Sequence, residues 1–340
     1  MSDIGEAVLK ITRGEDLDYD EAKSVMDSIM SGECSPVMIS SYLTALAQKG
    51  ETVDEIAASA EEMRSHGLKL PGDHRQDLEI VGTGGDRSGS FNISTTSAFV
   101  VAACGVPVAK HGNRAASSKC GAADVLEALG AVIDMSPEQS AEVLKKCGFC
   151  FMFAQRYHAS MKYVAPVRKE LGIRTVFNIL GPLTNPAAAG NQLSGVYCEE
   201  LVRPMAEVLH KLGVWNAMVV YGRDGLDELS VCDSTYCCEV RDGRFDEYSI
   251  TPEDVGLSRH PHSALVGGGP QENAAITRNV LSGEEGARRE AVLLNAGAGL
   301  YTSGKAGTIM HGITMAEKAI DSGKAMDALE SYIKTSRSVV

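Results

Sequence analysis

The stretch GTGGDRSGSFNIST, residues 82–95, joins a short apolar run to a longer one and sets how the chain folds around it. It holds four glycines and five hydroxyl side chains, with Asp86 near its middle. Ordering a glycine costs more conformational entropy than ordering any other residue, so this composition needs a reason. Glycines let backbone N–H groups approach a phosphate, and Ser94 and Thr95 begin a helix whose N-terminus favours an anion. The stretch therefore predicts a strand–loop–helix unit with an anion site; an ordinary turn between strand and helix is the alternative.

Outward from this loop, strand and helix patterns alternate through short loops that contain glycine. Strands are predicted at 77–82, 106–112, 131–135, 149–154, 194–198 and 216–222. Such alternation favours a mostly parallel sheet flanked by helices. A hairpin around Asp242 and Gly243 is predicted to add antiparallel strands, and helical patterns follow from 271 onward. In such sheets ligands bind beyond the carboxyl ends of the strands, so the loops that follow strands matter most.

The first seventy residues contain only helical patterns. Three helix-start signals lie there: the capping boxes Asp18–Glu21 and Thr52–Glu55, and Ser35 before Pro36. The sequence thus predicts an α/β protein with a small helical domain over residues 1–72 and a larger α/β domain over 73–340. The segment 160–190 interrupts the alternation, has a helical pattern with Pro166 inside it, and is predicted to rejoin the helical domain.

Composition narrows the class of protein. The formal net charge is −13, and no basic run is longer than a pair, so nucleic acid is not an expected partner. The chain has no apolar run of transmembrane length, and its N-terminus is acidic, which favours a soluble cytoplasmic protein. Nine scattered cysteines favour a reducing compartment. Cys147 and Cys150 form a C-x-x-C beside the apolar run FCFMFA, which favours a buried strand over a redox or metal site.

The loop after the predicted strand 106–112 gathers positive charge. Its sequence AKHGNRAASSKCG, residues 109–121, contains the cations Lys110, Arg114 and Lys119 among short polar side chains. This composition suits a mobile flap over a multiply charged ligand. A solvated surface loop is the alternative for such a cluster taken alone.

The loop after the predicted strand 216–222 contains two adjacent carboxylates, Asp227 and Glu228. Mg²⁺ keeps several waters and usually bridges one or two carboxylates to substrate phosphates, so this pair is a candidate metal site. Neighbouring side chains point to opposite sides of an extended backbone, so two ions or a tight turn would be required. General acid–base catalysis is the weaker alternative.

Taken together, the segments GTGGD, FNIST, KHGNRAASS, VRKELGIRTVFNILGPLTNP and DGLDELS resemble those of the anthranilate phosphoribosyltransferase family. The resemblance spans most of the chain and keeps the order and spacing of the segments. GTGGD is shared with pyrimidine nucleoside phosphorylases of the same fold, whereas KHGNR and DGLDE are more specific. Those phosphorylases carry a Lys-x-Ser-Gly-Arg type of loop where this chain has KHGNR. A pyrimidine nucleoside phosphorylase and a non-catalytic relative that binds nucleic acid remain the alternative functions.

The resemblance implies that anthranilate attacks C1 of 5-phosphoribosyl 1-pyrophosphate and releases pyrophosphate, a step of tryptophan biosynthesis. Charge develops on the departing pyrophosphate as the ribose gains oxocarbenium character, so metal ions and hydrogen-bond donors aimed at that charge supply the catalysis. No side-chain nucleophile is needed. The family is typically a homodimer joined through its helical domain, which implies the same assembly here, with one or two Mg²⁺ ions, small-molecule substrates and no membrane partner.

Carried over position by position, the resemblance assigns three sets of residues. The set for phosphoribosyl pyrophosphate is Gly82, Gly85, Asp86, Ser90, Asn92, Ile93, Ser94, Thr95, Lys110, His111, Gly112, Asn113, Arg114, Ala115, Ala116, Ser117, Ser118 and Ala122. The set for Mg²⁺ is Ser94, Asp227 and Glu228, and the set for anthranilate is Gly82, Asn113 and Arg168. Helical spacing alone gives Arg168 no function, but a bidentate bond to the anthranilate carboxylate gives it one.

Overall fold

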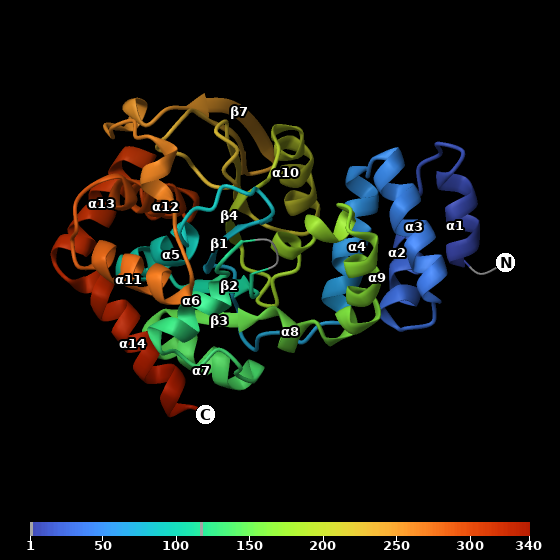
Figure 1. Cartoon of the computed structure of the whole chain (residues 1–340), viewed down its shortest axis with the longest axis horizontal. Coiled ribbons are helices and arrows are strands. Elements are labelled where there is room, and N and C mark those ends of the chain that lie inside the picture. Colours follow the sequence, from blue (N-terminus) through green and yellow to red (C-terminus); the bar gives the residue numbers. More distant parts are fainter. Residues whose placement is uncertain (1–2, 116–117) are drawn as a thin grey trace.

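The computed structural model describes residues 3–115 and 118–340, which form a helical domain beside a larger α/β domain (Figure 1). The helical domain begins with α1 (Asp3–Ile11), α2 (Tyr19–Met30), α3 (Pro36–Lys49) and α4 (Val53–Ser65). The predicted helix starts are confirmed: Asp18 and Thr52 form capping boxes, and Ser35 caps α3. Each cap satisfies backbone N–H groups that the first helical turn leaves without partners.

A seven-stranded sheet forms the centre of the larger domain, in the order β3-β2-β1-β4-β5-β6-β7. Its strands are β1 (Leu78–Gly82), β2 (Val108–Gly112), β3 (Phe149–Phe153), β4 (Asn191–Gly195), β5 (Asn216–Gly222), β6 (Thr235–Arg241) and β7 (Arg244–Ile250). Strands β1 to β5 pair in parallel, and β6 and β7 are antiparallel. The hairpin between them turns at Asp242 (φ 51°) and Gly243 (φ 73°), as predicted. The predicted fold class is confirmed.

Helices cover both faces of the sheet. The helices of this domain are α5 (Ile93–Ala103), α6 (Ala122–Leu129), α7 (Pro137–Cys147), α8 (Ala154–Tyr157), α10 (Val202–Lys211), α11 (Pro270–Leu281), α12 (Ala287–Thr302), α13 (Ile309–Asp321) and α14 (Lys324–Ser338). On one face α5 packs between the sheet and α12, α13 and α14 in a single apolar core. On the other face α10 packs on β5 and β6 and also contacts α4, so a second core continues into the helical domain.

The segment that interrupts the alternation packs against the helical domain. It consists of η1 (Ala159–Tyr163), α9 (Ala165–Leu171), η2 (Val176–Asn178) and η3 (Gly181–Leu183), and its apolar side chains join the core of α1–α4. Pro166 lies in the first turn of α9, where its missing N–H removes no hydrogen bond. The expected helix with Pro166 in its interior is therefore wrong. The domain division at 72 and 73, with 160–190 rejoining the first domain, stays a prediction.

Two predicted strands differ from the structure. Residues 131–135 are not a strand, although Ala131, Ile133 and Met135 are buried in alternation as a strand would be. This segment is extended but packs beside α14, where Val132 N–H donates to Ser336 Oγ at 3.1 Å. The strand expected at 194–198 is β4, which runs from Asn191 to Gly195. Its first two residues, Asn191 and Gln192, are polar and do not fit the apolar pattern of a buried strand, so the prediction missed its start.

Two further expectations concern membranes and cysteines. In the described parts of the chain, no helix is both long and apolar enough to cross a bilayer. Cys150 is fully buried in β3, as predicted, and Cys147 ends α7. Burial raises the pKa of both thiols, which disfavours the reactive thiolate.

Candidate active site

The three loops singled out in the sequence meet at one edge of the sheet. The chain continues from β1 through α5 to β2 on one side, whereas β4 lies on the other side of β1, so the β1–β4 boundary is the switch point of the sheet. Ligands bind at such switch points, beyond the carboxyl ends of the strands. The glycine loop (residues 83–92) follows β1, the flap (residues 113–121) follows β2, and the acidic pair, Asp227 and Glu228, follows β5.

The glycine loop turns sharply between β1 and α5. Gly84 (φ +69°), Gly85 (φ +75°) and Gly89 (φ +67°) are left-handed, and Arg87 (φ 61°) is left-handed despite its side chain. Added Cβ atoms at the three glycines would meet nothing within 4 Å, so backbone conformation and not crowding favours glycine there. Successive N–H groups in turns of this kind form anion-binding concavities. The loop thus has a backbone shape that suits phosphate.

The acidic pair reaches back to this loop through backbone hydrogen bonds. Gly84 N–H donates to Asp227 Oδ2 at 2.7 Å, and Ser94 N–H donates to Glu228 Oε1 at 3.0 Å. One donor lies in the glycine loop, and the other lies in the first turn of α5. In this conformation two N–H groups suited to a phosphate therefore bind the protein's own carboxylates.

Glycines on β1 and β4 make room for the acidic pair. The chain after β5 forms a tight turn just before the acidic pair, in which Gly222 N–H donates to Leu226 O at 2.8 Å. A Cβ at Gly82 would lie 2.3 Å from Asp227 Oδ2, and a Cβ at Gly195 would lie 1.5 Å from Asp227 O. Atoms cannot approach so closely, so both positions require glycine while Asp227 keeps its place.

The surroundings of the acidic pair disfavour the negative charge of both carboxylates. Burial, followed by the nearby Asp86 carboxylate, raises the pKa of Asp227 to about 7. Burial and the neighbouring Asp227 raise the pKa of Glu228 well above its usual range. Within residues 3–115 and 118–340, Glu228 Oε2 is buried and has no hydrogen-bond partner. A divalent cation would satisfy this oxygen and favour both charges, so the residues present fit Mg²⁺.

Lys110 lies in β2, and its side chain meets β1 and the start of α5 and not the flap. Its buried Nζ donates to Ile80 O at 2.6 Å and to Ser94 Oγ at 3.3 Å. Burial lowers the pKa of Lys110 to about 8, while the Glu79 carboxylate and the acidic pair oppose that shift. The next residue, His111, is held through its backbone N–H, which donates to Glu79 Oε1 at 3.0 Å. Burial lowers the pKa of His111 to about 3, so its ring is neutral.

The flap is tied to α6 by ion pairs. Arg114 donates to Asp124 at 3.1 Å and to Glu127 Oε1 at 2.9 Å. Asp124 Oδ2 also accepts the N–H groups of Ala115 and Gly121, each at 2.9 Å. For Arg114 to reach a bound anion, these exposed ion pairs have to break, and exposed pairs of this kind are weak.

The other predicted residues in and beside the flap make the following contacts. Asn113 Oδ1 accepts Gln155 Nε2–H at 3.4 Å, and Ser118 Oγ donates to Cys120 O at 3.4 Å. Gly112 ends β2, where a Cβ would lie 2.9 Å from a ring carbon of Phe151, and Ala122 begins α6. Ala116 and Ser117 lie outside the described residues.

The predicted residues around the start of α5 divide into two kinds. Asn92 donates from Nδ2 to Cys120 O at 3.2 Å, which links the glycine loop to the flap. Asn92 Oδ1 and Thr95 Oγ1 are buried and have no partner among the described residues, so they can bond to a ligand. Ile93 is fully buried in the core and can contribute only through its backbone. Ser90 pairs with Val266 in an isolated bridge.

Arg168 lies on α9, which packs against α3 of the helical domain. Its guanidinium is 5.5 Å from the centre of the Phe177 ring, and burial lowers the pKa of Arg168. A half-buried guanidinium of this kind favours a carboxylate partner. Arg174 touches the glycine loop: it donates to Gly85 O at 2.8 Å, and its guanidinium lies 3.9 Å from the centre of the Tyr197 ring.

Sequence reasoning missed three polar residues of this region: Glu79, Arg174 and Asn295. Glu79 is fully buried in β1, and its signal is a lone carboxylate inside an apolar strand. Asn295 is likewise a lone amide inside the apolar helix α12. The sequence around Arg174 gives no such signal, because its partner Gly85 is far away along the chain.

Two family models match the chain. Residues 6–67 match the helical bundle domain of a glycosyl transferase family, and residues 74–326 match the a/b domain of a glycosyl transferase family. The two matches follow one another along the chain, as the helical domain and the larger domain of the structure do.

Curated relatives and solved structures match over nearly the whole length. The anthranilate phosphoribosyltransferase of Methanobrevibacter smithii is 58% identical over 335 residues, 98% of this chain and 100% of the relative. The crystal structure of anthranilate phosphoribosyltransferase (TrpD) from Thermus thermophilus has a TM-score of 0.93 at 48% identity, covering 99% and 100% of the two chains. The Saccharomyces cerevisiae enzyme in complex with PRPP and Mg has a TM-score of 0.90 at 29% identity, covering 98% of both chains. The same yeast enzyme was solved with 4-fluoroanthranilate (TM-score 0.88, 28% identity, 98% of both chains).

Proposed function

Because the chain belongs to the glycosyl transferase family and, within it, to the anthranilate phosphoribosyltransferases, we propose that the glycine loop, the flap and the acidic pair bind 5-phosphoribosyl 1-pyrophosphate and Mg²⁺. The chain is an enzyme that transfers the phosphoribosyl group to anthranilate in tryptophan biosynthesis, giving N-(5-phosphoribosyl)anthranilate and pyrophosphate. The family and the reaction predicted from the sequence are confirmed. Two alternative functions were a pyrimidine nucleoside phosphorylase and a nucleic-acid-binding relative. The transferase is favoured over both, because relatives that match 98% of this chain are named anthranilate phosphoribosyltransferase.

One observation carries the proposed site: the acidic pair is hydrogen-bonded to the backbone donors of Gly84 and Ser94. Donors for phosphate and ligands for a cation are thereby in contact, as a magnesium pyrophosphate requires. The yeast relative was solved with PRPP and Mg, which supports the same pairing here. Asp227, Glu228 and Ser94 would hold one or two Mg²⁺ ions.

The mechanism needs positioning and charge stabilisation, not a side-chain nucleophile. Bound Mg²⁺ supplies a positive charge that stabilises the departing pyrophosphate. The N–H groups of Gly84 and Ser94, released by the acidic pair, donate to pyrophosphate oxygens, and the start of α5 favours their negative charge. The flap residues, the open oxygens of Asn92 and Thr95, and Asp86 complete the sugar-phosphate site. Arg168 orients anthranilate through its carboxylate so that the amine faces C1.

The proposed function is tested by anthranilate fluorescence. Purified wild-type protein with phosphoribosyl pyrophosphate and Mg²⁺ is expected to consume anthranilate, so its fluorescence falls with time. Parallel reactions of phosphate with thymidine or uridine are expected to give no free base. A folded protein that cleaves the nucleosides but leaves anthranilate unchanged would contradict the function.

Replacing Arg168 with Ala is expected to raise the KM for anthranilate by about tenfold or more, while the KM for phosphoribosyl pyrophosphate changes little. The reason is that the guanidinium is proposed to meet the anthranilate carboxylate alone. Initial rates measured against each substrate in turn check this expectation.

The matched control is Arg156→Ala, because Arg156 is exposed on α8 and pairs with Asp134 at 2.9 Å. This variant should keep both KM values. A larger rise in the KM for phosphoribosyl pyrophosphate than for anthranilate in the Arg168 variant would reassign that residue to the other substrate.

A homodimer in the cytoplasm is part of the same proposal. The helical domain presents apolar side chains to solvent, including Leu9 on α1 (46% exposed) and Val37 on α3 (73% exposed). Burying such side chains between two copies is favourable. Light scattering of the purified protein measures its mass, and a monomer at micromolar concentration would contradict the dimer.

A further inference from the structure

The backbone that carries the acidic pair is fixed by a residue of a distant helix. Asn295 lies on α12 and is 2% exposed. Its Oδ1 accepts the N–H of Leu229 at 3.0 Å, and its Nδ2 donates to Leu229 O at 2.8 Å. Leu229 follows Glu228 directly and is fully buried. The amide of Asn295 therefore satisfies both backbone groups of Leu229, as a neighbouring strand would.

Asn295 is itself held rigidly. Its Nδ2 also donates to Ala291 O at 3.0 Å, one turn earlier in α12. Helix α12 packs against β4 and α5, which flank the site, so its position is set by the core of the domain. A Cβ at Gly195 of β4 would lie 1.5 Å from Asp227 O, so β4 also lies directly against the backbone of the acidic pair. The backbone of the pair thus contacts β4 at Asp227 and is hydrogen-bonded to Asn295 at Leu229.

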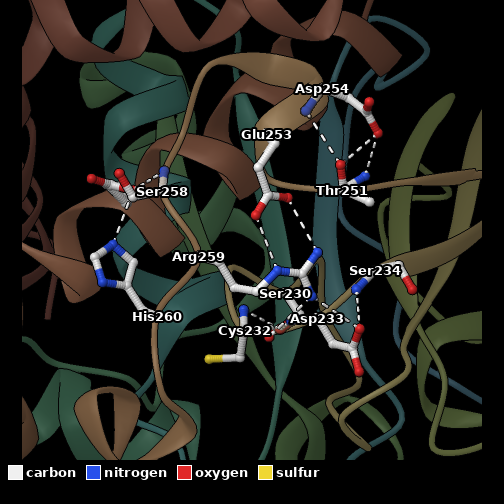
Figure 2. A network of polar contacts seen from close by, with 11 residues as sticks. Ser230, Cys232, Asp233, Ser234, Thr251, Glu253, Asp254, Ser258, Arg259 and His260 are labelled. Carbon is white, nitrogen blue, oxygen red and sulfur yellow. Dashed lines mark hydrogen bonds and ion pairs between the residues drawn. The ribbon is translucent and has the colours of Figure 1, made fainter.

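Other contacts of this loop hold it farther along the chain. Figure 2 shows Arg259 between Glu253 and Asp233, and Ser230 at the backbone of Cys232 and Asp233. These contacts hold residues 230–234, which follow the acidic pair. The side chains of the acidic pair accept hydrogen bonds from Gly84 and Ser94, but these bonds would break when the carboxylates bind a metal ion. The bonds between Asn295 and Leu229 lie next to Glu228 and can remain when the metal binds.

We propose that Asn295 is a positioning residue for the metal site: by fixing Leu229 it holds Glu228 and Asp227 where both can bind one cation. The inference rests on the proposed function, since it takes the acidic pair as the metal site. Groups that orient metal ligands in this way typically change metal affinity by about 10- to 100-fold when removed.

The test is a titration with Mn²⁺ alone, followed by the electron paramagnetic resonance signal of the free ion, on the full-length protein. Asn295→Ala removes both bonds to Leu229 and is expected to weaken Mn²⁺ binding by about tenfold or more. Asn295→Asp keeps the acceptor for Leu229 N–H but places a carboxylate oxygen against Leu229 O and Ala291 O, so it is expected to weaken Mn²⁺ binding as well. The Mg²⁺ concentration that gives half-maximal turnover should rise in both variants, with the KM for anthranilate unchanged.

The matched control is Asn191→Ala. Asn191 is also a buried amide that donates to backbone, to Asp77 O at 3.2 Å, but it lies at the start of β4, at the opposite edge of the sheet. This variant is expected to lower the melting temperature without changing Mn²⁺ affinity. If Asn295→Ala does not fold, Asn295→Asp carries the test.

The outcomes separate the inference from the function on which it rests. Wild-type protein that binds no Mn²⁺ would contradict the proposed metal site. Wild-type binding that both Asn295 variants retain within twofold would overturn the positioning role and leave the metal site standing. Equal weakening by Asn191→Ala would also overturn it, because general destabilisation would then explain the effect.

Discussion

Replacing Asp227 with Asn and Glu228 with Gln in one chain is expected to lower the Mg²⁺-dependent turnover of anthranilate by about 10²-fold or more at saturating substrates. Both substitutions keep the size of the side chain and its acceptor for a backbone N–H, so the bonds to Gly84 and Ser94 can persist. What is lost is the negative charge that holds the cation. Steady-state rates at several Mg²⁺ concentrations measure the effect.

The matched control for this double variant is Asp233→Asn with Glu253→Gln. These two carboxylates are exposed, both bind Arg259, and their replacement changes the net charge by the same amount (Figure 2). Their turnover should equal that of the wild type, because exposed ion pairs contribute little. A double variant of the acidic pair with wild-type turnover would refute the metal assignment.

Replacing Gly195 with Ala is expected to reduce turnover by a similar factor, about 10²-fold, through sterics alone. The new Cβ would lie 1.5 Å from Asp227 O and 2.2 Å from Asp227 C, so the backbone of the acidic pair has to move. Asn295 holds the adjoining Leu229 through two hydrogen bonds, which resist such a movement. The melting temperature should fall as well, since overpacking of a close contact costs about 1–3 kcal/mol.

Gly307→Ala is the control for this substitution. Gly307 precedes α13, a Cβ there would meet nothing within 4 Å, and its φ is not left-handed. This variant is expected to keep wild-type turnover and stability. If Gly195→Ala kept wild-type turnover and the same Mg²⁺ requirement, the position of the acidic pair would not matter for the reaction.

Features that depend on neighbouring residues could be predicted from the sequence. The helix caps, the Asp242–Gly243 hairpin and the left-handed glycines of the loop follow from local backbone chemistry. The parallel order of β1, β2 and β5 then brings the three loops to one edge. The mostly apolar segment AVIDM at 131–135 misled the prediction, because a segment packed beside a helix can have the same sequence pattern as a strand.

Contacts between distant segments could not be predicted. Asn295 meets Leu229, Arg174 meets Gly85 and Lys110 meets Ser94 only once the sheet has formed. The sequence places Lys110 in a cationic flap, whereas in β2 its side chain reaches Ile80 O of β1 and Ser94 Oγ at the start of α5. Likewise the sequence suggests free backbone donors, while the structure pairs two of them with the acidic pair.

Under the proposed function, this pairing makes binding of the substrate depend on the cation. The N–H groups of Gly84 and Ser94 are bonded to the acidic pair, and they become free for a pyrophosphate once a cation attracts the two carboxylates. Isothermal titration calorimetry of phosphoribosyl pyrophosphate into the wild-type protein, once with Mg²⁺ and once with EDTA, tests this claim most directly. Saturable binding with Mg²⁺ and an affinity weaker by about 10²-fold or more with EDTA is the predicted result. The same dissociation constant in both titrations would contradict it.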